Sequence, residues 1–551
     1  MNKLKINILA LATVVAGLGL PSCSDSFLDV SSKTESTTGN FYKTEGDAWR
    51  ALIGCYDGWR QISSAPQIGF YVASTVMSDE TYGATGNGDG WGYQAVDRFD
   101  NSVSPGDLNL YQNDWKAYYA GVYRCNEFLS RADDIAWLEA SGNRELYLGE
   151  THALRALLYF DMVRLWGNIP LFLEPVNENR EQANPDEVYE AIFADLKFAA
   201  ENIPADANLS KADNGRITRY AAEAMMARAY LFYTGYYGKE PAGVTKQEIV
   251  NYLEDIVSSH NFELIDAVKN LYPASSLVPL ANSTGWDPEL STYAGEANKE
   301  VLLQMKFTPS QDYNGNNDSN RWMVMMGMRS INSSPYGKGW GACTVCPAFL
   351  NKFSADDPRR AASVIDLAAE GITANPVYGA SVKDWREYTG YCVKKYSPLA
   401  FPNGNNASRP DGTGDFQITN FQNWVIMRYA DVLLMVSELG GVPSMDAQAA
   451  LDAVRSRSGL ASIPATKENV LNERALELAF EGHRYWDLLR QGVDKLADAV
   501  CATSGTVKNG GVDATVTFER AKIIETKGLS QIPNTQITLS NGVLKQNTGW
   551  Y

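Results

Sequence analysis

The sequence is poor in positive charge. Its 551 residues include 48 lysines and arginines against 65 aspartates and glutamates, which gives a formal net charge of -17. No basic patch interrupts this acidic balance, so long-range repulsion would oppose contact with a phosphate backbone. We therefore exclude nucleic acid as a partner.

Histidine is scarce as well, with three in the whole chain. Cys343 and Cys346 form a lone C-x-x-C motif with no histidine nearby, whereas a closed zinc site needs four ligands. The sequence therefore predicts no metal site and no cofactor. The two cysteines could form a disulfide or remain two buried thiols.

An asparagine-rich turn alternates oxygen-bearing side chains in the manner of a calcium loop. Asn317 and Met323 stand where an EF-hand has its glycine and glutamate, so the turn is not an EF-hand. A solvated turn is the simpler interpretation, and an irregular calcium site is the alternative. The alternating residues are Asp312, Asn314, Asn316 and Asp318.

Long hydrophobic runs are also missing. The longest, Ile6 to Leu20, has 15 residues, fewer than the ~20 that a membrane-spanning helix needs. Lys3 and Lys5 precede it, which predicts a secretory signal over residues 1–22. The run ends in Leu20-Pro21-Ser22-Cys23, which resembles a bacterial lipobox. Cys23 would then be the lipidated N-terminus of a membrane anchor, and residues 23–45 would be a tether.

The sequence does contain apolar residues at helical spacing. Glu150 to Pro170 is apolar around most of the helical wheel, which predicts a buried helix that ends near Trp166, before Gly167. The segment from Arg228 resembles the segment from Arg155, 73 positions earlier. This spacing is near twice the roughly 34-residue period of tetratricopeptide helix pairs. We expect a mainly α fold built on tetratricopeptide-like helical pairs, with a loop-rich, ligand-binding elaboration.

The chain divides by pattern into an N-terminal helical region (46–271), a loop-rich insertion (272–421) and a C-terminal helical region (422–551). Strands are predicted only near 301–308 and 391–396. Residues 76–104 show neither helical nor strand periodicity, although they are rich in aromatic residues and glycine. Further helices are predicted at 47–60, 113–132, 184–202, 246–258, 425–437, 445–458 and 467–481.

Several segments together resemble the SusD/RagB family of Bacteroidetes outer-membrane lipoproteins. The first are the lipobox with Phe27-Leu28-Asp29 after it and the stretch from Arg155 that ends in WGNIPLF. The others are Ile217 to Tyr230, Met427 to Leu434, and the pair Asn472 to Ala475 and Phe480 to Leu488. They occur in the family's order from end to end of the chain.

The resemblance implies a lipid-anchored protein on the outer membrane, facing the cell exterior. Members of the family cover a SusC-like TonB-dependent transporter and capture oligosaccharides, or in a minority peptides, for import; they are not enzymes. The signature segments belong to the family's scaffold. The resemblance therefore implies a fold and a function but places no ligand.

Candidate ligand contacts come from the residues themselves. Sugar rings have an apolar face and a rim of hydroxyls, so a binder needs flat aromatic surface beside planar hydrogen-bonding groups. The glycine-rich loop around Trp91 offers both, although Trp91 could instead anchor this loop on the helical body. The loop candidates are Trp91, Tyr93, Tyr82, Asp79, Asn87, Asp89 and Arg98, and the secondary candidates are Trp322, Asn320, Trp286 and Trp340.

Other aromatic and acidic residues are assigned to the scaffold. Glu473, Glu477 and Glu481 are spaced four apart and share one helix face. We interpret them as members of structural ion pairs and not as catalytic acids. Five tryptophans at helical spacing are predicted to lie in the core: Trp49, Trp59, Trp115, Trp166 and Trp486.

Two other functions remain open. A secreted glycoside hydrolase would fit an acidic chain rich in tryptophan, but it needs two carboxylates about 5 to 10 Å apart, which sequence cannot show. A RagB-like lipoprotein with the same fold would bind a peptide. The sequence favours an oligosaccharide-binding lipoprotein without catalytic residues.

Overall fold

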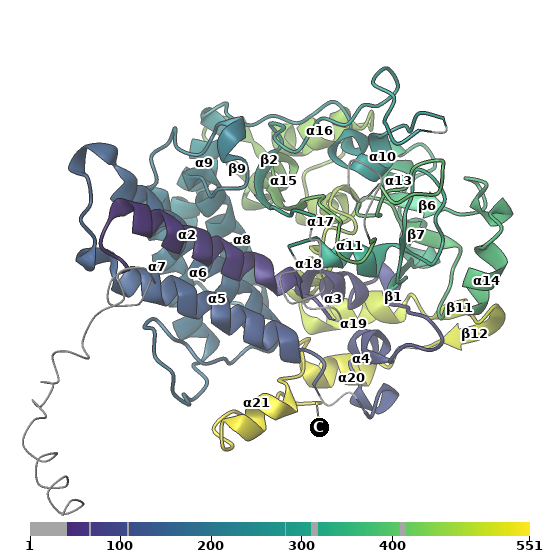
Figure 1. Ribbon diagram of the computed structural model, residues 1–551, viewed down its shortest axis with the longest axis horizontal. Coiled ribbons are helices and arrows are strands. Elements are labelled where there is room, and N and C mark those ends of the chain that lie inside the picture. Colours follow the sequence, from purple (N-terminus) through teal and green to yellow (C-terminus); the bar gives the residue numbers. More distant parts are fainter. Residues whose placement is uncertain are drawn as a thin grey trace, which may run out of the picture.

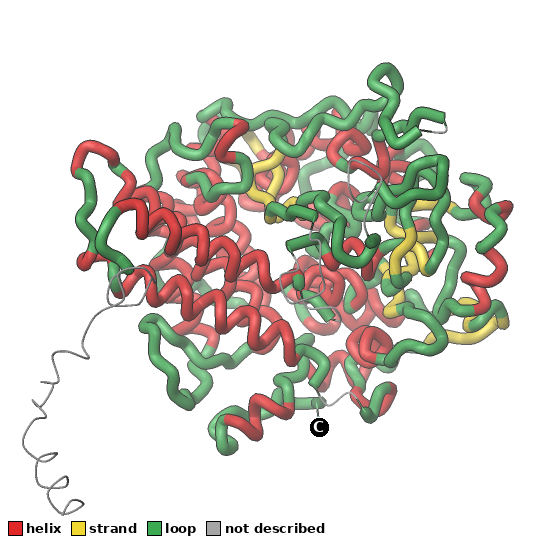
Figure 2. The backbone as a smooth tube through the Cα atoms, viewed as in Figure 1, coloured by secondary structure: helices red, strands yellow, loops and turns green. Residues whose placement is uncertain are grey.

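The structure is a computed structural model that describes residues 41–64, 68–106, 109–281, 283–309, 318–407 and 415–550. The signal segment, Cys23 and the asparagine-rich turn from Asp312 to Asn316 lie outside the described residues. Helices gather on one side of the molecule, and most of the strands and long loops lie on the other (Figure 2). Among the described helices, none is both long and apolar enough to cross a bilayer.

Helical pairs form the N-terminal half, as predicted. Each helix packs against the next along the chain, and α2, α5, α6 and α7 lie side by side in Figure 1. The predicted helices at 184–202 and 246–258 are confirmed to within one residue at each end. The long helices are α2 (Glu45–Arg60), α5 (Gln112–Ser130), α6 (Asn143–Trp166), α7 (Pro185–Asn202), α8 (Arg219–Tyr237) and α9 (Lys246–Ser258).

Helix α6 is the centre of this half. It is buried almost continuously from Leu148 to Trp166, and Gly167 ends it with a positive φ of 69°, a conformation that favours glycine. Its buried charges are paired. Arg155 donates from Nε to Asp195 of α7 over 2.8 Å, and Arg164 pairs with Asp161 over 2.7 Å. The predicted end of the helix is confirmed, while its start lies earlier than the apolar pattern indicated.

The loop-rich middle is held by a small antiparallel sheet with strand order β1-β5-β7-β6. Its strands are β1 (Thr81–Gly83), β5 (Cys343–Val345), β7 (Tyr391–Val393) and β6 (Val364–Asp366). Because β1 pairs with β5, the chain near Thr81 lies against the chain near Val345. Short helices connect these strands: α10 (Pro273–Ser276), α11 (Arg321–Met326), α12 (Pro347–Leu350), α13 (Pro358–Ser363) and α14 (Tyr378–Lys383).

Two assignments from periodicity were wrong. Residues 76–104 contain β1 and α4 (Gly92–Arg98), and α3 (Phe70–Val76) leads into them. Residues 425–428 belong to β8 (Trp424–Arg428), whereas a helix was predicted to begin at 425. Strand β8 pairs with β2 (Val301–Met305), and this tertiary partner decides the conformation of a short apolar segment that could be either helix or strand.

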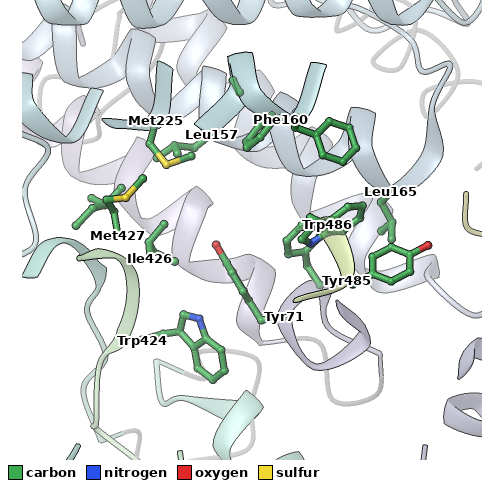
Figure 3. Packing of buried hydrophobic residues seen from close by; sticks show 14 of the residues in the cluster. Tyr71, Leu157, Phe160, Leu165, Met225, Trp424, Ile426, Met427, Tyr485 and Trp486 are labelled. Carbon is green, nitrogen blue, oxygen red and sulfur yellow. The ribbon is translucent and has the colours of Figure 1, made fainter. Parts of the chain in front are cut away.

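The C-terminal helices pack back onto the N-terminal scaffold. Trp486 stacks on Phe70 with ring centroids 5.2 Å apart, and its indole lies opposite Phe160 and Leu157 of α6 (Figure 3). The helices are α15 (Tyr429–Leu439), α16 (Ala447–Arg457), α17 (Lys467–Glu477), α18 (Arg484–Leu489), α19 (Val493–Cys501), α20 (Arg520–Thr526) and α21 (Asn534–Leu539). The remaining strands are β3 (Met328–Arg329), β4 (Lys338–Gly339), β9 (Gly441–Val442), β10 (Met445–Asp446), β11 (Gly505–Asn509) and β12 (Val512–Val516).

A buried ionic network joins the middle of the chain to the C-terminal helices. Arg428 is 1% exposed and contacts Glu300 at 2.8 Å, Glu477 at 2.6 Å and Glu481 at 2.9 Å. Burial alone would raise the pKa of Glu481, but Arg428 and Lys395 lower it to about 2. The ion-pair interpretation of the three spaced glutamates is confirmed. Their partners lie on distant segments, in Arg359, Lys395, Arg428, Arg455 and Arg457.

Four of the five tryptophans assigned to the core are buried: Trp59, Trp115, Trp166 and Trp486. The assignment of Trp49 was wrong, because this side chain is 38% exposed on the outer face of α2. Its indole lies beside Tyr147, with ring centroids 5.6 Å apart, and the guanidinium carbon of Arg216 is 5.0 Å from its ring centroid. Helical spacing alone could not tell that this turn of α2 faces outward.

Candidate functional site

One cavity of the structure has a volume of about 490 Å³. It lies between the loop that leads into α4 and the segment from α11 to β4. Gly90 and Gly92 line it on the α4 side, and Trp340 and Met325 line the opposite side. The lining residues are Ile68, Thr85, Asp89, Gly90, Gly92, Tyr93, Asn109, Leu110, Met325, Arg329 and Trp340.

Trp91 lies on the segment that lines the α4 side of this cavity. Its side chain is 44% exposed, and its neighbours Gly90 and Gly92 both line the cavity. Trp91 occupies the N-cap position of α4, where no side-chain hydrogen bond caps the helix. A large aromatic side chain is therefore presented to solvent from a turn that is tied to a helix. The prediction that Trp91 contacts ligand stays a prediction, and its position is compatible with it.

A buried arginine, Arg386, supports the Trp91 loop, the segment from Thr85 to Trp91. The guanidinium carbon of Arg386 lies 4.1 Å from the centroid of the Trp91 ring, within cation-π range. Its Nη2 donates to the carbonyl oxygens of Asp89 at 3.0 Å and Gly90 at 2.8 Å, and to the Thr85 hydroxyl at 2.5 Å. Arg386 thus fixes both the indole and the backbone that carries it.

A second arginine ties the loop to the opposite wall. Nη1 of Arg329 donates to the Asp89 carboxylate at 2.8 Å, and its Nε donates to Asp384 at 2.9 Å. Gly86 lies so close that a Cβ on it would be 2.0 Å from the Arg329 guanidinium. A side chain at position 86 would therefore displace the Arg329 guanidinium from this position.

Trp340 forms the aromatic part of the far wall. Its side chain is partly buried, and the guanidinium carbon of Arg321 lies 5.4 Å from its ring centroid. It follows β4, whose Gly339 packs so closely on Gly327 that no side chain would fit between the two backbones. The cavity therefore has one indole, Trp340, in its wall and a second, Trp91, on a segment that lines it, and each indole is paired with a guanidinium.

The remaining loop candidates are spread around this region. Asn87 is exposed and donates to the Lys383 carbonyl at 2.6 Å. Arg98 pairs with Asp97 and, at 2.7 Å, with Glu387, which makes it part of the loop's support. Trp286 lies apart and packs on Phe401 with ring centroids 4.9 Å apart. Of the predicted residues, Asp89, Tyr93 and Trp340 line the cavity, and Trp91 lies between the lining residues Gly90 and Gly92.

Four candidates are buried and have structural partners, so we do not retain them. Asp79 pairs with Arg484 at 2.8 Å, and the Tyr82 hydroxyl donates to the Thr503 carbonyl at 2.5 Å. All four candidate side chains are at most 2% exposed, so none of them is accessible to a ligand. The other two are Asn320, which donates to the Gln422 carbonyl at 2.9 Å, and Trp322, which packs between Tyr71 and Trp424.

Several residues of the site were not identified from the sequence, Arg386 and Arg329 foremost among them. Arg386 is 297 positions from Asp89, whose carbonyl it holds, and no motif surrounds it. Asn109 and Met325 also line the cavity from segments without any binding signal. Only the folding of the middle region against the α4 loop brings these side chains together.

The cavity offers little for catalysis or metal binding. Of the described residues that line it, Asp89 alone carries a carboxylate, and that group is paired with Arg329. In the described parts of the chain, no cluster of three or more histidine, cysteine or acidic side chains could hold a metal ion. Cys343 and Cys346 are both free thiols, and burial raises the pKa of Cys343 to about 12. The arrangement is suited to binding.

Comparison with known proteins agrees with this architecture. The family described as "SusD family" matches residues 371–550, and the family described as "Starch-binding associating with outer membrane" matches residues 72–231. SusD-like protein P2 of Formosa agariphila is 24% identical over an alignment that covers 100% of both chains. The chain belongs to the SusD family.

Solved structures of SusD-like proteins share the fold of this family member. A laminarin binding SusD-like protein is 27% identical, with a TM-score of 0.70 over 92% of this chain and 99% of that chain. Surface glycan-binding protein A from Bacteroides fluxus is 25% identical, with a TM-score of 0.72 and the same coverage. The paired helices α2 to α9 are thus the tetratricopeptide-like scaffold of a SusD-family protein.

Proposed function

We propose that this SusD-family protein binds an oligosaccharide in the cavity between Trp91 and Trp340. The observation that carries the proposal is the exposed Trp91 indole, which Arg386 holds and which lies between two glycines that line the 490 Å³ cavity. The C-H face of a sugar ring packs on flat aromatic surface, and a pre-positioned indole loses little conformational entropy on binding.

The polar lining of the cavity suits the hydroxyl rim of a sugar. Asn109 contributes an amide, Thr85 a hydroxyl, and Asp89 and Arg329 a linked carboxylate and guanidinium. These groups donate and accept hydrogen bonds beside the two indoles. Two proteins of similar structure, a laminarin binding SusD-like protein and a surface glycan-binding protein, support a glycan as the ligand class.

In this proposal the protein captures and delivers its ligand without cleaving it. Lipidation of Cys23 would anchor it to the outer membrane, where a SusC-like TonB-dependent transporter would receive the oligosaccharide. Support comes from the matched family description, which names association with the outer membrane. It also comes from the cavity, where a single lining carboxylate falls short of the pair that glycoside hydrolysis needs.

Replacing Trp91 by alanine is expected to weaken oligosaccharide binding by about tenfold or more, because a well-placed aromatic side chain often dominates an interface. Calorimetry with laminarihexaose, maltohexaose and a pool of matched peptides measures the effect and the ligand class together. Tyr123→Ala is a suitable control, since Tyr123 of α5 is 46% exposed and does not line the cavity.

Three results would contradict the proposal. Full glycan affinity in Trp91→Ala would remove the assigned site. Binding of peptides but not of glycans would favour the RagB-like alternative. Release of reducing ends from laminarin or starch by the pure protein would identify a hydrolase.

Arg386 is expected to act through Trp91 as a positioning residue. Arg386→Met removes the cation-π contact and the three hydrogen bonds to the loop, so affinity should fall about threefold to tenfold while the fold is retained. The effects of Arg386→Met and Trp91→Ala should not be additive in a double-mutant cycle. Arg180→Met is the matched control, since Arg180 stacks on Phe172 with its guanidinium carbon 4.7 Å from the ring centroid. Additive effects would show that Arg386 does not position Trp91.

A further inference from the structure

A second cavity, of about 210 Å³, lies on the helical side of the molecule. It is formed by the connection between α7 and α8, the segment after α9, and the start of β2. It shares no lining residue with the first cavity. In Figure 1, α9 and β2 lie toward the upper left and α4 toward the lower right. A ligand in this cavity would therefore bind independently of Trp91.

Amide side chains dominate the polar lining of the second cavity. Gln304 is 2% exposed, and its Nε2 donates to the Asn214 amide oxygen and, at 2.8 Å, to the Glu296 carbonyl. These bonds fix the orientation of both amides. An amide both donates and accepts, which is the property needed to bind hydroxyl groups. The lining amides are Asn208, Asn214, Asn261, Asn298 and Gln304.

A smaller pocket next to the second cavity has polar groups that are incompletely paired. This pocket, about 20 Å³, shares Asn298, Val301 and Gln304 with the second cavity and is also lined by Gln422 and Asn423. Gln422 is 5% exposed, yet neither heteroatom of its amide has a hydrogen-bond partner among the described residues. The same holds for Nδ2 of Asn423. A buried amide left unpaired costs free energy, so this neighbouring pocket favours a polar occupant.

Most charges around the cavity are compensated. Lys299 pairs with Glu263 at 3.2 Å, Lys306 with Glu296 at 2.9 Å, and Arg216 with the buried Glu150. Lys211 also lines the cavity and forms no ion pair in the described part of the chain. Because paired charges give no net attraction and amides outnumber the one unpaired cation, the lining favours a neutral ligand. Phe262 and Leu209 add apolar surface to the amides. Flat apolar surface beside amides is the combination that suits a sugar ring.

We infer that this second cavity is a separate carbohydrate site for one neutral sugar unit, so that the protein contacts a glycan at two places. The inference rests on the proposed function for its ligand class, but not for its location. Two sites on one chain would raise the avidity for a long polysaccharide above that of either site.

One titration reports on both sites. With 5-fluorotryptophan incorporated, the 13 tryptophans of the full-length chain each give a fluorine resonance. The resonances of Trp91 and Trp49 are assigned by their loss in the variants Trp91→Phe and Trp49→Phe. Trp91 reports on the first cavity. Trp49 reports on the second, because Arg216 lines that cavity and its guanidinium carbon lies 5.0 Å from the Trp49 ring centroid. Glucose, laminarihexaose and maltohexaose are the probes.

We expect both resonances to shift, with different midpoints. Ala297→Phe fills the second cavity from its lining and should cost at least about tenfold in affinity at Trp49, while the response of Trp91 is unchanged. Asn214→Leu, which removes one lining amide, should act in the same direction. Ala374→Phe, on an exposed turn that lines neither cavity, should leave both responses unchanged.

Each other outcome is decisive. If Trp91 shifts and Trp49 does not move at any sugar concentration, the second site is refuted and the proposed function stands. If Trp49 shifts alone, in a manner sensitive to Ala297→Phe, the second site stands and the first is refuted. If neither resonance moves with any probe, both are refuted. A Trp49 shift that persists in Ala297→Phe and Asn214→Leu would place the bound sugar elsewhere and overturn this assignment.

Discussion

Replacing Arg428 by methionine is expected to destabilise the protein by about 3–5 kcal/mol, the range for breaking a buried ion pair by removing one partner. Arg428 is 1% exposed and holds Glu300, Glu477 and Glu481, which come from the middle of the chain and from the C-terminal region. Methionine fills similar space but leaves three buried carboxylates with one fewer cation. The middle region would then lose one of its ionic attachments to the C-terminal region, while those of Arg359 and Lys395 would remain.

Chemical denaturation of both proteins at pH 7 measures this difference. Arg520→Met is the matched control, because Arg520 also contacts two carboxylates, Asp494 at 2.5 Å and Asp498 at 2.8 Å, but its side chain is 49% exposed. Water and salt screen such exposed pairs, so the denaturation midpoint should not change. Equal losses in the two variants would show that burial does not determine the strength of the Arg428 network.

Glu80→Gln is expected to protect the protein from loss of stability at alkaline pH. Burial raises the pKa of Glu80 to about 8. A hydrogen bond from the Phe480 amide opposes this rise, and the nearby Asp79 charge adds to it. The folded state therefore keeps a proton that the unfolded state, with an ordinary pKa of 4.5, releases. This contribution to stability is fully present below pH 4.5 and is lost as the pH rises toward 8.

The expected size is on the order of 2–3 kcal/mol between pH 6 and pH 9, since stability changes by about 1.4 kcal/mol per pH unit and per proton only up to the folded-state pKa of about 8. Glutamine does not titrate, so denaturation midpoints of Glu80→Gln should decline less over this window than those of the wild-type protein. Burial also raises the pKa of Glu387 to about 8, so part of the wild-type decline should persist in the variant. Parallel pH profiles for the two proteins would show that Glu80 does not titrate there.

The candidate site was partly predictable because one of its walls is a continuous segment. Tryptophan among glycines, with polar side chains on both sides, indicated an exposed aromatic side chain, and Trp91 is exposed beside a cavity. The same reasoning failed for Tyr82 and Asp79, which lie at the start of this loop but enter the core through β1 and the ion pair with Arg484. Composition shows that a loop is unusual, but it does not show where the loop leaves the surface.

Long-range contacts were beyond the reach of the sequence. Arg386 has no motif around it, and its function as a support depends on folding that brings α14 and the residues after it beneath the Trp91 loop. The glutamates on α17 were correctly expected to form ion pairs, but their cationic partners are contributed by other segments. A charge on a helix indicates that a partner is needed, and only the packed structure identifies which one.

The sequence by itself determined the helical scaffold. Apolar periodicity, the Asn184 cap and the Gly167 stop are local signals, and a helix satisfies its own backbone hydrogen bonds. Helix α6 therefore ends before Gly167 and α7 begins after Asn184, as those signals indicated. Tertiary structure alone decided the strand β8, the outward orientation of Trp49 and the two cavities. A strand, an exposed face and a cavity all depend on a neighbour that is distant in the chain, and no local pattern specifies that neighbour.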